Sequence, residues 1–278
     1  HSHQIARPRA GGGHRSPGAA DTLARVQVDR LLRLLDDTAA AVIGALDGHA
    51  VGRPDLWRLA GDRPGQYRLD LVADEAALPV LHRAGVGVLS EESGLHDTGC
   101  GVTVVIDPVD GSTNASRGLP WYATSLCAVD DEGPLAALVV NLATGARYQA
   151  VRGGGATLDG RPVKHSGVTR AEDALLVLNG YPPQHFGWRQ YRSLGASALD
   201  LCSVADGRVD GTVDCSEDAL GPWDYLGALL VLNEVGAPVC DVHGRELVVL
   251  DHDARRTPVS AATPELHEAL LTARREMW

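Results

Sequence analysis

VVIDPVDGSTNASRG, residues 104–118, is the stretch on which the interpretation of the whole chain depends. A short apolar run is followed by two aspartates, Asp107 and Asp110, with Pro108 between them. Proline fixes φ and lacks an amide hydrogen, so we expect the chain to turn here and leave both carboxylates at the mouth of a sheet. Gly111 permits backbone conformations that a Cβ opposes, and the donors after it can form an anion-binding nest or begin a helix. The same residue types also make ordinary surface turns, so other carboxylates must decide between a turn and a site.

Two other segments supply such carboxylates. SEESG at 90–94 follows a second apolar run, and Asp224 stands at the start of an apolar helical pattern. Taken alone, Glu91 is typical of a solvated loop and Asp224 of a helix N-cap. Together with the two aspartates of the first stretch they form an all-oxygen set without histidine or cysteine. Such a set suits Mg²⁺ or Mn²⁺ and argues against zinc.

Composition narrows the class of protein. The 278 residues are 44% hydrophobic and 22% charged, with a formal net charge of -11. The net negative charge disfavours a nucleic-acid binder. Anionic substrates remain possible at a site where bound cations make the local charge positive. The five cysteines are scattered and form no CxxC pair, which is typical of reduced thiols in a cytoplasmic protein. We see no apolar run long enough for a membrane span, and we expect residues 1–20 to be a disordered leader or tag remnant.

Hydrophobic periodicity predicts a layered α+β protein. Helical spacing covers residues 21–46, 73–84, 196–205, 225–235 and 264–275. Short apolar or alternating runs predict strands over residues 86–89, 102–106, 123–129, 135–141, 146–151, 175–179, 208–214, 238–240 and 259–261. The elements arrive in blocks rather than in strict alternation, which disfavours a single doubly wound sheet.

The boundaries between these elements suggest two lobes. A polar segment near 165–173 divides an N-terminal lobe, residues 21–168, from a C-terminal lobe, residues 169–278. Residues 48–68 are rich in Gly and Pro and are expected to form loops, and Gly153-Gly154-Gly155 is expected to be a hairpin turn rather than a phosphate loop. We expect a solvated surface position for His165, His185, His243, His252, His267, Arg255 and Arg256.

Four segments together resemble the inositol monophosphatase family, the Mg²⁺-dependent, lithium-sensitive sugar-phosphate phosphatases. They are SEESG at 90–94, IDPVDGSTN at 106–114, RSLGASALDLCSVADGRVDG at 192–211 and WDYLGALLVLNEVGAPVCD at 223–241. The resemblance extends over residues 65–265. It implies a five-layer α/β/α/β/α sandwich of the sugar-phosphatase type, with the site between two lobes, and a homodimer.

The resemblance also implies a role for each residue of these motifs. Glu91, Asp107 and the carbonyl of Val109 would hold one metal ion, and Asp107, Asp110 and Asp224 a second. Ser112 stands where the family usually has Thr, and with Glu91 it would position and activate the attacking water. The substrate would contact Asp110, Gly111, Ser112, Thr113, Gly195, Ala196, Ser197, Glu217 and Asp224.

The activity implied is hydrolysis of a small polyol or sugar phosphate, with inositol 1-phosphate first, by metal-activated water. Two or three Mg²⁺ ions would be required, Mn²⁺ could substitute, and Li⁺ would inhibit. No nucleic acid or membrane is expected as a partner.

Departures from the family pattern leave alternatives open. DGSTNASRGLPWYATSL is closer to archaeal-type members, which favours a fructose-1,6-bisphosphatase-like activity as the alternative, and histidinol-phosphate phosphatase is another. Families acting on histidinol phosphate or nucleoside bisphosphates often carry Lys where Thr113 stands, which disfavours both.

The upstream acidic motif is shortened to Asp70-Leu71-Val72-Ala73-Asp74, so Asp70 is either a ligand of a third metal through water or a helix-start residue. The non-enzymatic alternative is a catalytically weak, metal- or phosphate-binding regulatory protein.

Overall fold

The computed structural model describes residues 19–50, 58–61 and 66–277, with side chains from residue 26 to 46 of the first range. The predicted leader, residues 1–20, lies outside the described residues except for its last two, which already belong to the first helix. The predicted loop at 48–68 is described only at 58–61 and 66–68, where Leu59 and Tyr67 form an isolated antiparallel bridge.

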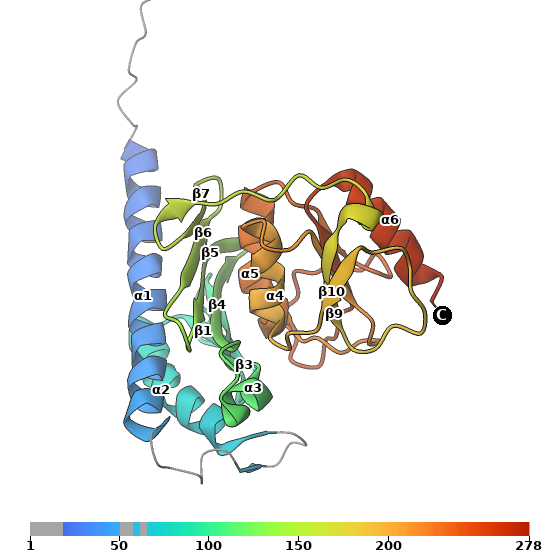
Figure 1. Ribbon diagram of the computed structural model, residues 1–278. Helices are drawn as coiled ribbons and strands as arrows, with labels where there is room; N and C mark the ends of the chain where they lie inside the picture. Colours follow the sequence, from blue (N-terminus) through green and yellow to red (C-terminus); the bar gives the residue numbers. More distant parts are fainter. Residues whose placement is uncertain (1–18, 51–57, 62–65, 278) are drawn as a thin grey trace, which may run out of the picture.

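Five layers stack in the order helices, sheet, helices, sheet, helix (Figure 1). The outer layer holds α1 (Ala19–Ala50) and α2 (Arg68–Ala84), the central layer α4 (Ser197–Ala205) and α5 (Pro222–Glu234), and the last layer α6 (Pro264–Arg275). Two short helices, α3 (Ser112–Arg117) and the 3-10 turn η1 (Ala171–Asp173), complete the helical elements of the described residues. This confirms the layered α+β sandwich.

The first sheet has eight strands in the order β2-β1-β3-β4-β5-β6-β7-β8. Only β1 and β3 are parallel, and all other neighbours are antiparallel. The bounds are β1 (Gly87–Ser90), β2 (Gly94–His96), β3 (Thr103–Asp110), β4 (Ala123–Asp130), β5 (Gly133–Asn141), β6 (Arg147–Val151), β7 (Gly155–Leu158) and β8 (Arg161–Pro162).

The second sheet has five strands in the order β10-β9-β11-β13-β12. Its first three strands are parallel, and β13 pairs antiparallel with both β11 and β12. The bounds are β9 (Leu175–Asn179), β10 (Gln190–Arg192), β11 (Gly211–Asp214), β12 (Val239–Asp241) and β13 (Pro258–Ala261).

Helix α5 is the centre of the molecule. It contacts β3 to β7 of the first sheet and β12 of the second, so it is covered on opposite sides. Leu226, Val231 and Leu232 are fully buried, and nearly every residue of its first three turns is buried. A helix that is apolar all round is stable only in such a position. The buried helix therefore fixes its own first turn, which carries Asp224, at the junction of the two sheets.

The elements that the periodicity did not predict are short or marginal. Strands β2, β7, β8 and β10 have two to four residues each, and the whole of β10 is exposed. Helix α2 begins five residues before the predicted start, because Asp70 accepts a hydrogen bond from Tyr67 N at 2.8 Å and so caps the helix. This supports the helix-start interpretation of Asp70. Of the triglycine at 153–155, Gly153 and Gly154 lie between β6 and β7 and Gly155 begins β7, which confirms the predicted hairpin turn.

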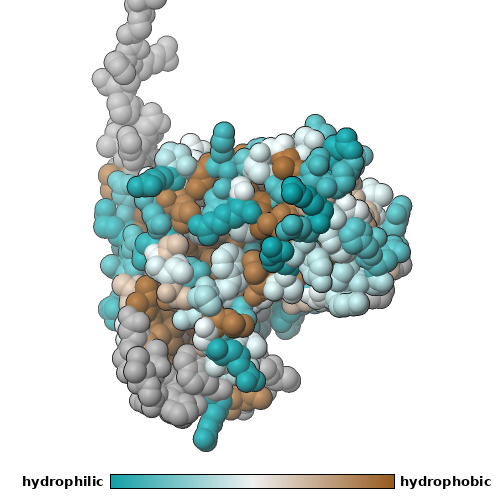
Figure 2. All heavy atoms as spheres, viewed as in Figure 1, coloured by the Kyte–Doolittle hydropathy of each residue, from teal (hydrophilic) through white to brown (hydrophobic). Residues whose placement is uncertain are grey.

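The surface adds little about the class of protein. Over the described residues, no helix combines the length and the apolar character needed to cross a bilayer. The face drawn in Figure 2 mixes hydrophilic residues with small groups of hydrophobic ones.

Candidate active site

A β-bulge places Asp107 and Asp110 on the same face of the first sheet. Residues three apart on a regular strand point to opposite faces. Here Asp107 pairs with Ser125 and Asp110 with Ala123, so three steps on β3 match two on β4. The extra residue reverses the alternation, and both side chains point the same way. The expected turn at Pro108 is therefore wrong: β3 continues through it to Asp110.

The strand tolerates Pro108 because the ladder with β1 has ended before it. The last β1–β3 pair is Ser90 with Ile106, and Glu91 N then donates to Ile106 O at 3.1 Å. Beyond that point β3 donates no ladder hydrogen bond to β1. The amide hydrogen that Pro108 lacks is therefore not needed on the β1 side of the strand.

Three carboxylates converge at this point. Oxygens of Asp107, Asp110 and Asp224 all lie within 4.8 Å of one another, with the first two residues buried and the third half-buried. Asp224 comes from the first turn of α5, where its Oδ2 also accepts from Gly221 N at 2.7 Å. The interpretation of Asp224 as the N-cap residue is therefore wrong, since Gly221 is the N-cap, but from the third helical position its carboxylate accepts from the Gly221 amide and also joins the cluster.

The electrostatics of the cluster are unfavourable for three anions. Burial is the largest influence and raises the pKa of Asp107 well above its ordinary value, and the charges of Glu91, Asp110 and Asp224 raise it further. Burial and the charge of Glu91 likewise raise the pKa of Asp224. Carboxylates of like charge in a desolvated site oppose one another's ionisation. Such an arrangement therefore favours the binding of a cation.

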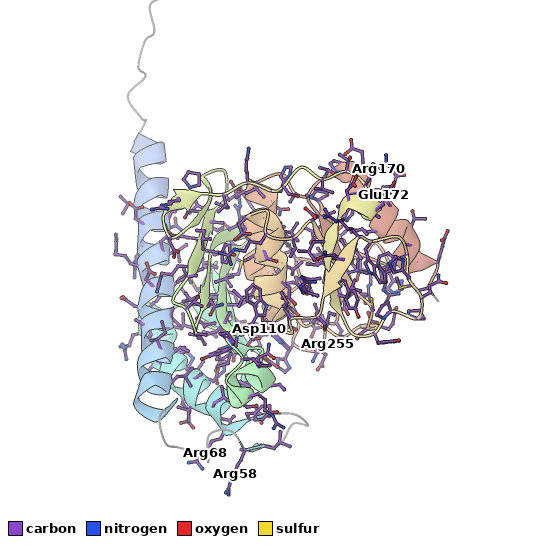
Figure 3. The ribbon with its side chains drawn as sticks, viewed as in Figure 1. Arg58, Arg68, Asp110, Arg170, Glu172 and Arg255 are labelled. Atoms are coloured by element: carbon purple, nitrogen blue, oxygen red, sulfur yellow. The ribbon has the colours of Figure 1, made fainter. Side chains whose placement is uncertain are left out.

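Asp110 is held by the N-terminus of α4 in addition. Its Oδ1 accepts from Ser197 N at 3.1 Å and its Oδ2 from Ala198 N at 2.7 Å. Burial raises the pKa of Asp110 to about 8 although these two hydrogen bonds favour the anion. A carboxylate on the first sheet thus caps a helix of the central layer and joins the two halves of the site. Figure 3 labels Asp110 at the lower end of the sandwich, close to α3.

The turn that carries Glu91 is fixed by α2. Ser90 Oγ donates to Asp74 Oδ1 at 2.5 Å and accepts from Glu92 N at 3.1 Å, while Gln66 Nε2 donates to the Glu92 carboxylate. The shortened acidic motif upstream therefore has a structural consequence, since Asp74 supports the segment beside Glu91. Glu91 itself is half-buried, and its charge acts on all three clustered aspartates.

The turn after Asp110 packs closely against the segment before α4. Gly111 has φ +82°, and a Cβ there would lie 2.9 Å from Ala196 Cβ and 3.0 Å from Gly195 O. Asn114 Nδ2 donates to Trp121 O at 2.8 Å and to Leu194 O at 2.6 Å. A side chain at Gly111 would force these two segments apart, so glycine is needed for the approach as well as for its dihedral angle.

The predicted residues fall into two groups. The structure brings one group together along β3, α3, α5 and the start of α4: Asp107, Val109, Asp110, Gly111, Ser112, Thr113, Gly195, Ala196, Ser197 and Asp224, with Glu91 in the adjoining turn. Val109 N donates to Asp107 Oδ1 at 2.9 Å, and Thr113 Oγ1 lies 3.4 Å from Tyr67 Oη. Asp70 is near enough to Asp107 for its charge to raise the pKa of that residue.

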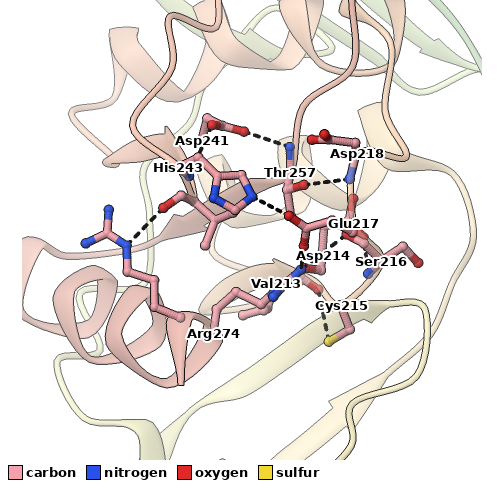
Figure 4. A network of polar contacts seen from close by, with 12 residues as sticks. Val213, Asp214, Cys215, Ser216, Glu217, Asp218, Asp241, His243, Thr257 and Arg274 are labelled. Atoms are coloured by element: carbon pink, nitrogen blue, oxygen red, sulfur yellow. Dashed lines mark hydrogen bonds and ion pairs between the residues drawn. The ribbon is translucent and has the colours of Figure 1, made fainter. Parts of the chain in front are cut away.

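Glu217 forms the other group and makes contacts of a different kind. Its carboxylate accepts from Arg274 Nη2 at 2.9 Å and pairs with His243 (Figure 4). Asp218 beside it pairs with Arg245 at 2.6 Å. These contacts connect Glu217 to α6 and to the loop after β12 rather than to the three aspartates.

Sequence reasoning missed several residues next to the cluster. Trp121 Nε1 donates to Asp200 Oδ1 at 2.7 Å, which ties the segment after α3 to the first turn of α4. His252 and Arg255, expected on the solvated surface, instead lie half-buried against Trp223, the neighbour of Asp224. No local pattern marks them, because their environment is made by residues far away in the chain.

The donor set fits a hard divalent cation. The cluster offers carboxylate oxygens and no thiolate or imidazole, and burial together with the neighbouring acids raises the pKa values of Asp107 and Asp224. A metal ion bound there would neutralise this repulsion.

Comparison with known proteins identifies the family of the chain. The model of the inositol monophosphatase family matches residues 68–278. The chain is similar to a fructose-1,6-bisphosphatase/inositol-1-monophosphatase of Archaeoglobus fulgidus, with 34% identity over 208 residues that cover 73% of this chain and 81% of the relative. It is also similar to a fructose-1,6-bisphosphatase of Pyrococcus furiosus, with 30% identity over 224 residues, 77% of this chain and 86% of the relative.

A solved structure shares the fold. A Pyrococcus horikoshii protein, described as having similarities to inositol-1 monophosphatase, superposes with a TM-score of 0.77 at 26% identity, covering 88% of this chain and 98% of its own. The family match spans all of the clustered carboxylates. The chain therefore belongs to the inositol monophosphatase family and is a phosphoric monoester hydrolase.

Proposed function

We propose that the protein is a Mg²⁺-dependent phosphomonoesterase that hydrolyses a small polyol or sugar phosphate, with inositol 1-phosphate as the first substrate. The observation that carries the proposal is the convergence of Asp107, Asp110 and Asp224 within 4.8 Å, with the charge of Glu91 acting on each. An oxygen-only cluster of this kind suits Mg²⁺.

In this proposal two ions share Asp107. Glu91, Asp107 and the carbonyl of Val109 would hold one, and Asp107, Asp110 and Asp224 the other. Bound Mg²⁺ would stabilise negative charge on the phosphoryl oxygens and lower the pKa of the attacking water. Asp70 would take part in a third site only through water, because its own carboxylate already caps α2.

The protein groups orient the reactants around these ions. The Ser112 hydroxyl and the Glu91 carboxylate would hold the attacking water in line with the ester bond. The amides of Gly111 and Ser112 would donate to the phosphate oxygens, which requires the close backbone approach that Gly111 allows. Ser112 is not proposed as a nucleophile, since water attacks directly and no phosphoenzyme forms.

The substrate's hydroxyls would meet the segment before α4. Gly195, Ala196 and Ser197 lie against the Gly111 turn, and Thr113 stands at the start of α3. Glu217, which the resemblance also assigns to the substrate, would need to exchange its contacts with Arg274 and His243 in order to reach a sugar hydroxyl.

Fructose 1,6-bisphosphate is the second candidate substrate. The names of the two curated relatives described above favour it, since both include fructose-1,6-bisphosphatase. Histidinol phosphate is the third compound to compare.

A substrate panel tests the proposal. Phosphate release is measured from the three compounds with Mg²⁺ alone, with Mg²⁺ plus Li⁺, and with the metal chelated. We expect Mg²⁺-dependent turnover, fastest with inositol 1-phosphate, and inhibition by Li⁺ competing at the site of Asp107, Asp110 and Asp224. Asp131→Asn, in the exposed turn between β4 and β5, is the matched control for Asp107→Asn, which removes one acid from the cluster. Turnover that survives chelation, or inertness of all three compounds, would refute the proposed substrate class or its metal requirement.

Assembly and location are part of the same proposal. We propose a homodimer in the cytoplasm, on the basis of the family and the unpaired cysteines. Light scattering coupled to gel filtration measures the mass of the assembly, and a monomer at micromolar concentration would contradict the dimer.

A further inference from the structure

The loop between β12 and β13 ends in a segment, residues 251–256, that braces itself around Arg255. Arg255 Nη1 donates to His252 O and to Ala254 O, each at 2.8 Å. Its guanidinium also lies 5.1 Å from the centre of the Trp223 ring. One side chain therefore holds the loop backbone in shape and fixes the loop against the start of α5. We call residues 251–256 the bracket.

His252 extends the bracket to the other half of the site. Its Nε2 lies 3.0 Å from Glu91 O, and because a carbonyl oxygen only accepts, Nε2 must carry the hydrogen. The same imidazole packs on Trp223 with ring centres 4.9 Å apart. A single ring therefore joins the turn after β1 to the first turn of α5.

The bracket is anchored at its base. Arg256 N donates to Leu220 O at 2.8 Å, Leu220 N donates back to Arg256 O at 3.2 Å, and Arg256 Nε donates to Glu246 O at 2.8 Å. Trp223 is 3% exposed, and its carbonyl accepts from Ser125 Oγ at 3.1 Å. The backbone of the residue whose ring receives both His252 and Arg255 is therefore itself tied to β4 of the first sheet.

These contacts connect the backbone of Glu91 to that of Asp224, two residues that come from different elements. Glu91 follows β1, and Asp224 follows Trp223 in α5. The β1–β3–β4 ladder and the Ser125–Trp223 hydrogen bond connect them through the sheet, and the contacts Glu91–His252–Trp223 add a connection through a single side chain. We propose that His252 and Arg255 are positioning residues that fix Glu91 relative to Asp224 and thereby set the dimensions of the metal site. The inference rests on the proposed function for the identity of the ligands.

Charge alone leads to the opposite expectation for Arg255. With the carboxylates ionised, a guanidinium whose charge acts on Asp224 repels an incoming cation, so its removal should tighten metal binding if only this repulsion mattered. If Arg255 acts by holding the bracket, its removal should weaken metal binding. The sign of the change in affinity distinguishes the two roles.

The test uses Mn²⁺ as the probe and measures its dissociation constant by electron paramagnetic resonance on the full chain. His252→Phe keeps a ring on Trp223 and removes the donor, whereas His252→Gln removes the ring and keeps an N–H at a similar reach. Arg255→Met removes the charge and both donors, and Arg255→Lys keeps the charge. Arg275→Met, on α6, is the control for loss of one positive charge.

We expect His252→Phe and Arg255→Met to weaken Mn²⁺ binding by about tenfold, the lower end of the effect of losing a partner that orients a metal ligand. His252→Gln should stay closer to the parent protein, Arg255→Lys should be intermediate, and Arg275→Met should have no effect. At saturating metal the kcat of each variant should recover, while the Mn²⁺ concentration for half-maximal activity stays raised.

Unchanged or tighter Mn²⁺ binding in Arg255→Met or His252→Phe would overturn the inference. If either variant fails to fold, His252→Gln and Arg255→Lys still decide it, because the order of their affinities is predicted. The binding measurement needs no turnover. A protein whose Mn²⁺ affinity depends on the bracket but that releases no phosphate would therefore refute the proposed function and leave the inference intact.

Discussion

Two clusters of potential metal ligands lie among the residues that the structure describes, and they differ in how their charge is balanced. Asp107, Asp110 and Asp224 converge in a buried site, and their pKa values are raised by burial and by one another. The second group, Glu217, Asp218 and His243, is exposed and is also close enough to share an ion. There, Arg274 and Arg245 donate to the carboxylates at 2.9 Å and 2.6 Å.

The pKa values of the two groups move in opposite directions. Desolvation disfavours ionisation of Glu217, but hydrogen bonds from His243 and Arg274 outweigh it and lower the pKa. Hydrogen bonds from Arg245 lower the pKa of Asp218. Proximity of acids alone therefore does not identify a metal site. Acids that already have arginine partners stabilise the fold, whereas buried acids without such partners are neutralised either by a proton or by a cation from outside.

The largest expected effect comes from Asp107→Asn. The variant should lose phosphatase activity by at least about a hundredfold, as expected when a group that stabilises transition-state charge is removed. Its stability without metal should rise, because one of the mutually repelling buried charges is gone. Phosphate release and thermal unfolding with and without Mg²⁺ measure both. A variant that is inactive and also less stable without metal would contradict the charge argument.

Arg274→Met should destabilise the protein by about 2–4 kcal/mol, the range for removing one member of a largely buried charged network. Arg274 is 1% exposed and donates to Asp214 O, Ser216 O and Glu217. Urea unfolding measures the loss. Mn²⁺ affinity at the first group should not change, and a change there would show that the two groups are not independent.

Asp214→Asn sharpens the comparison through pH. Asp214 lies beside the second group, yet burial raises its pKa to about 7. The folded protein then keeps a proton that the unfolded chain releases above its ordinary pKa of 3.8, so stability falls as pH rises from 3.8 to about 7. The amide variant should lack this loss and exceed the parent at pH 8 but not at pH 4. Urea unfolding at both pH values checks the sign, and a parent protein equally stable at both would contradict it.

Asp218→Asn should have the smallest effect. Asp218 has φ +48°, a conformation that asparagine also adopts, so the substitution removes the charge without adding backbone strain. The side chains of Asp218 and Arg245 are 47% and 34% exposed, and an exposed pair contributes less than about 1 kcal/mol. Urea unfolding should show little change in the free energy of unfolding. A loss comparable to that of Arg274→Met would contradict the small contribution expected of this exposed pair.

The sequence supplied the chemistry of the site but not its geometry. The carboxylates could be predicted because Glu91 and Asp107 each follow an apolar run and Asp224 opens an apolar helix. The bulge at Pro108 could not, since it depends on where the β1 ladder ends. Strand β10 carries no apolar alternation and exists because β9 offers it a partner.

Long-range contacts explain the other differences. Arg255 and His252 lack any local signature, because Trp223 and Glu91 give them their environment. The resemblance assigns Glu217 to the substrate, but its partners in the structure come from α6 and from His243. Residues whose role depends on one distant partner are those that periodicity and motif spacing do not identify.

The carboxylate of Asp110 serves two elements at once, and this has a thermodynamic consequence. Its oxygens receive the first amides of α4 and also face the position where a cation would bind. Ion occupancy and the docking of α4 are thus linked functions, and linkage is reciprocal. If docking of α4 favours ion binding, a bound ion stabilises the docked helix against local opening by the same free energy. Amide hydrogen exchange at Ser197 and Ala198 should therefore be slower when the ion is bound.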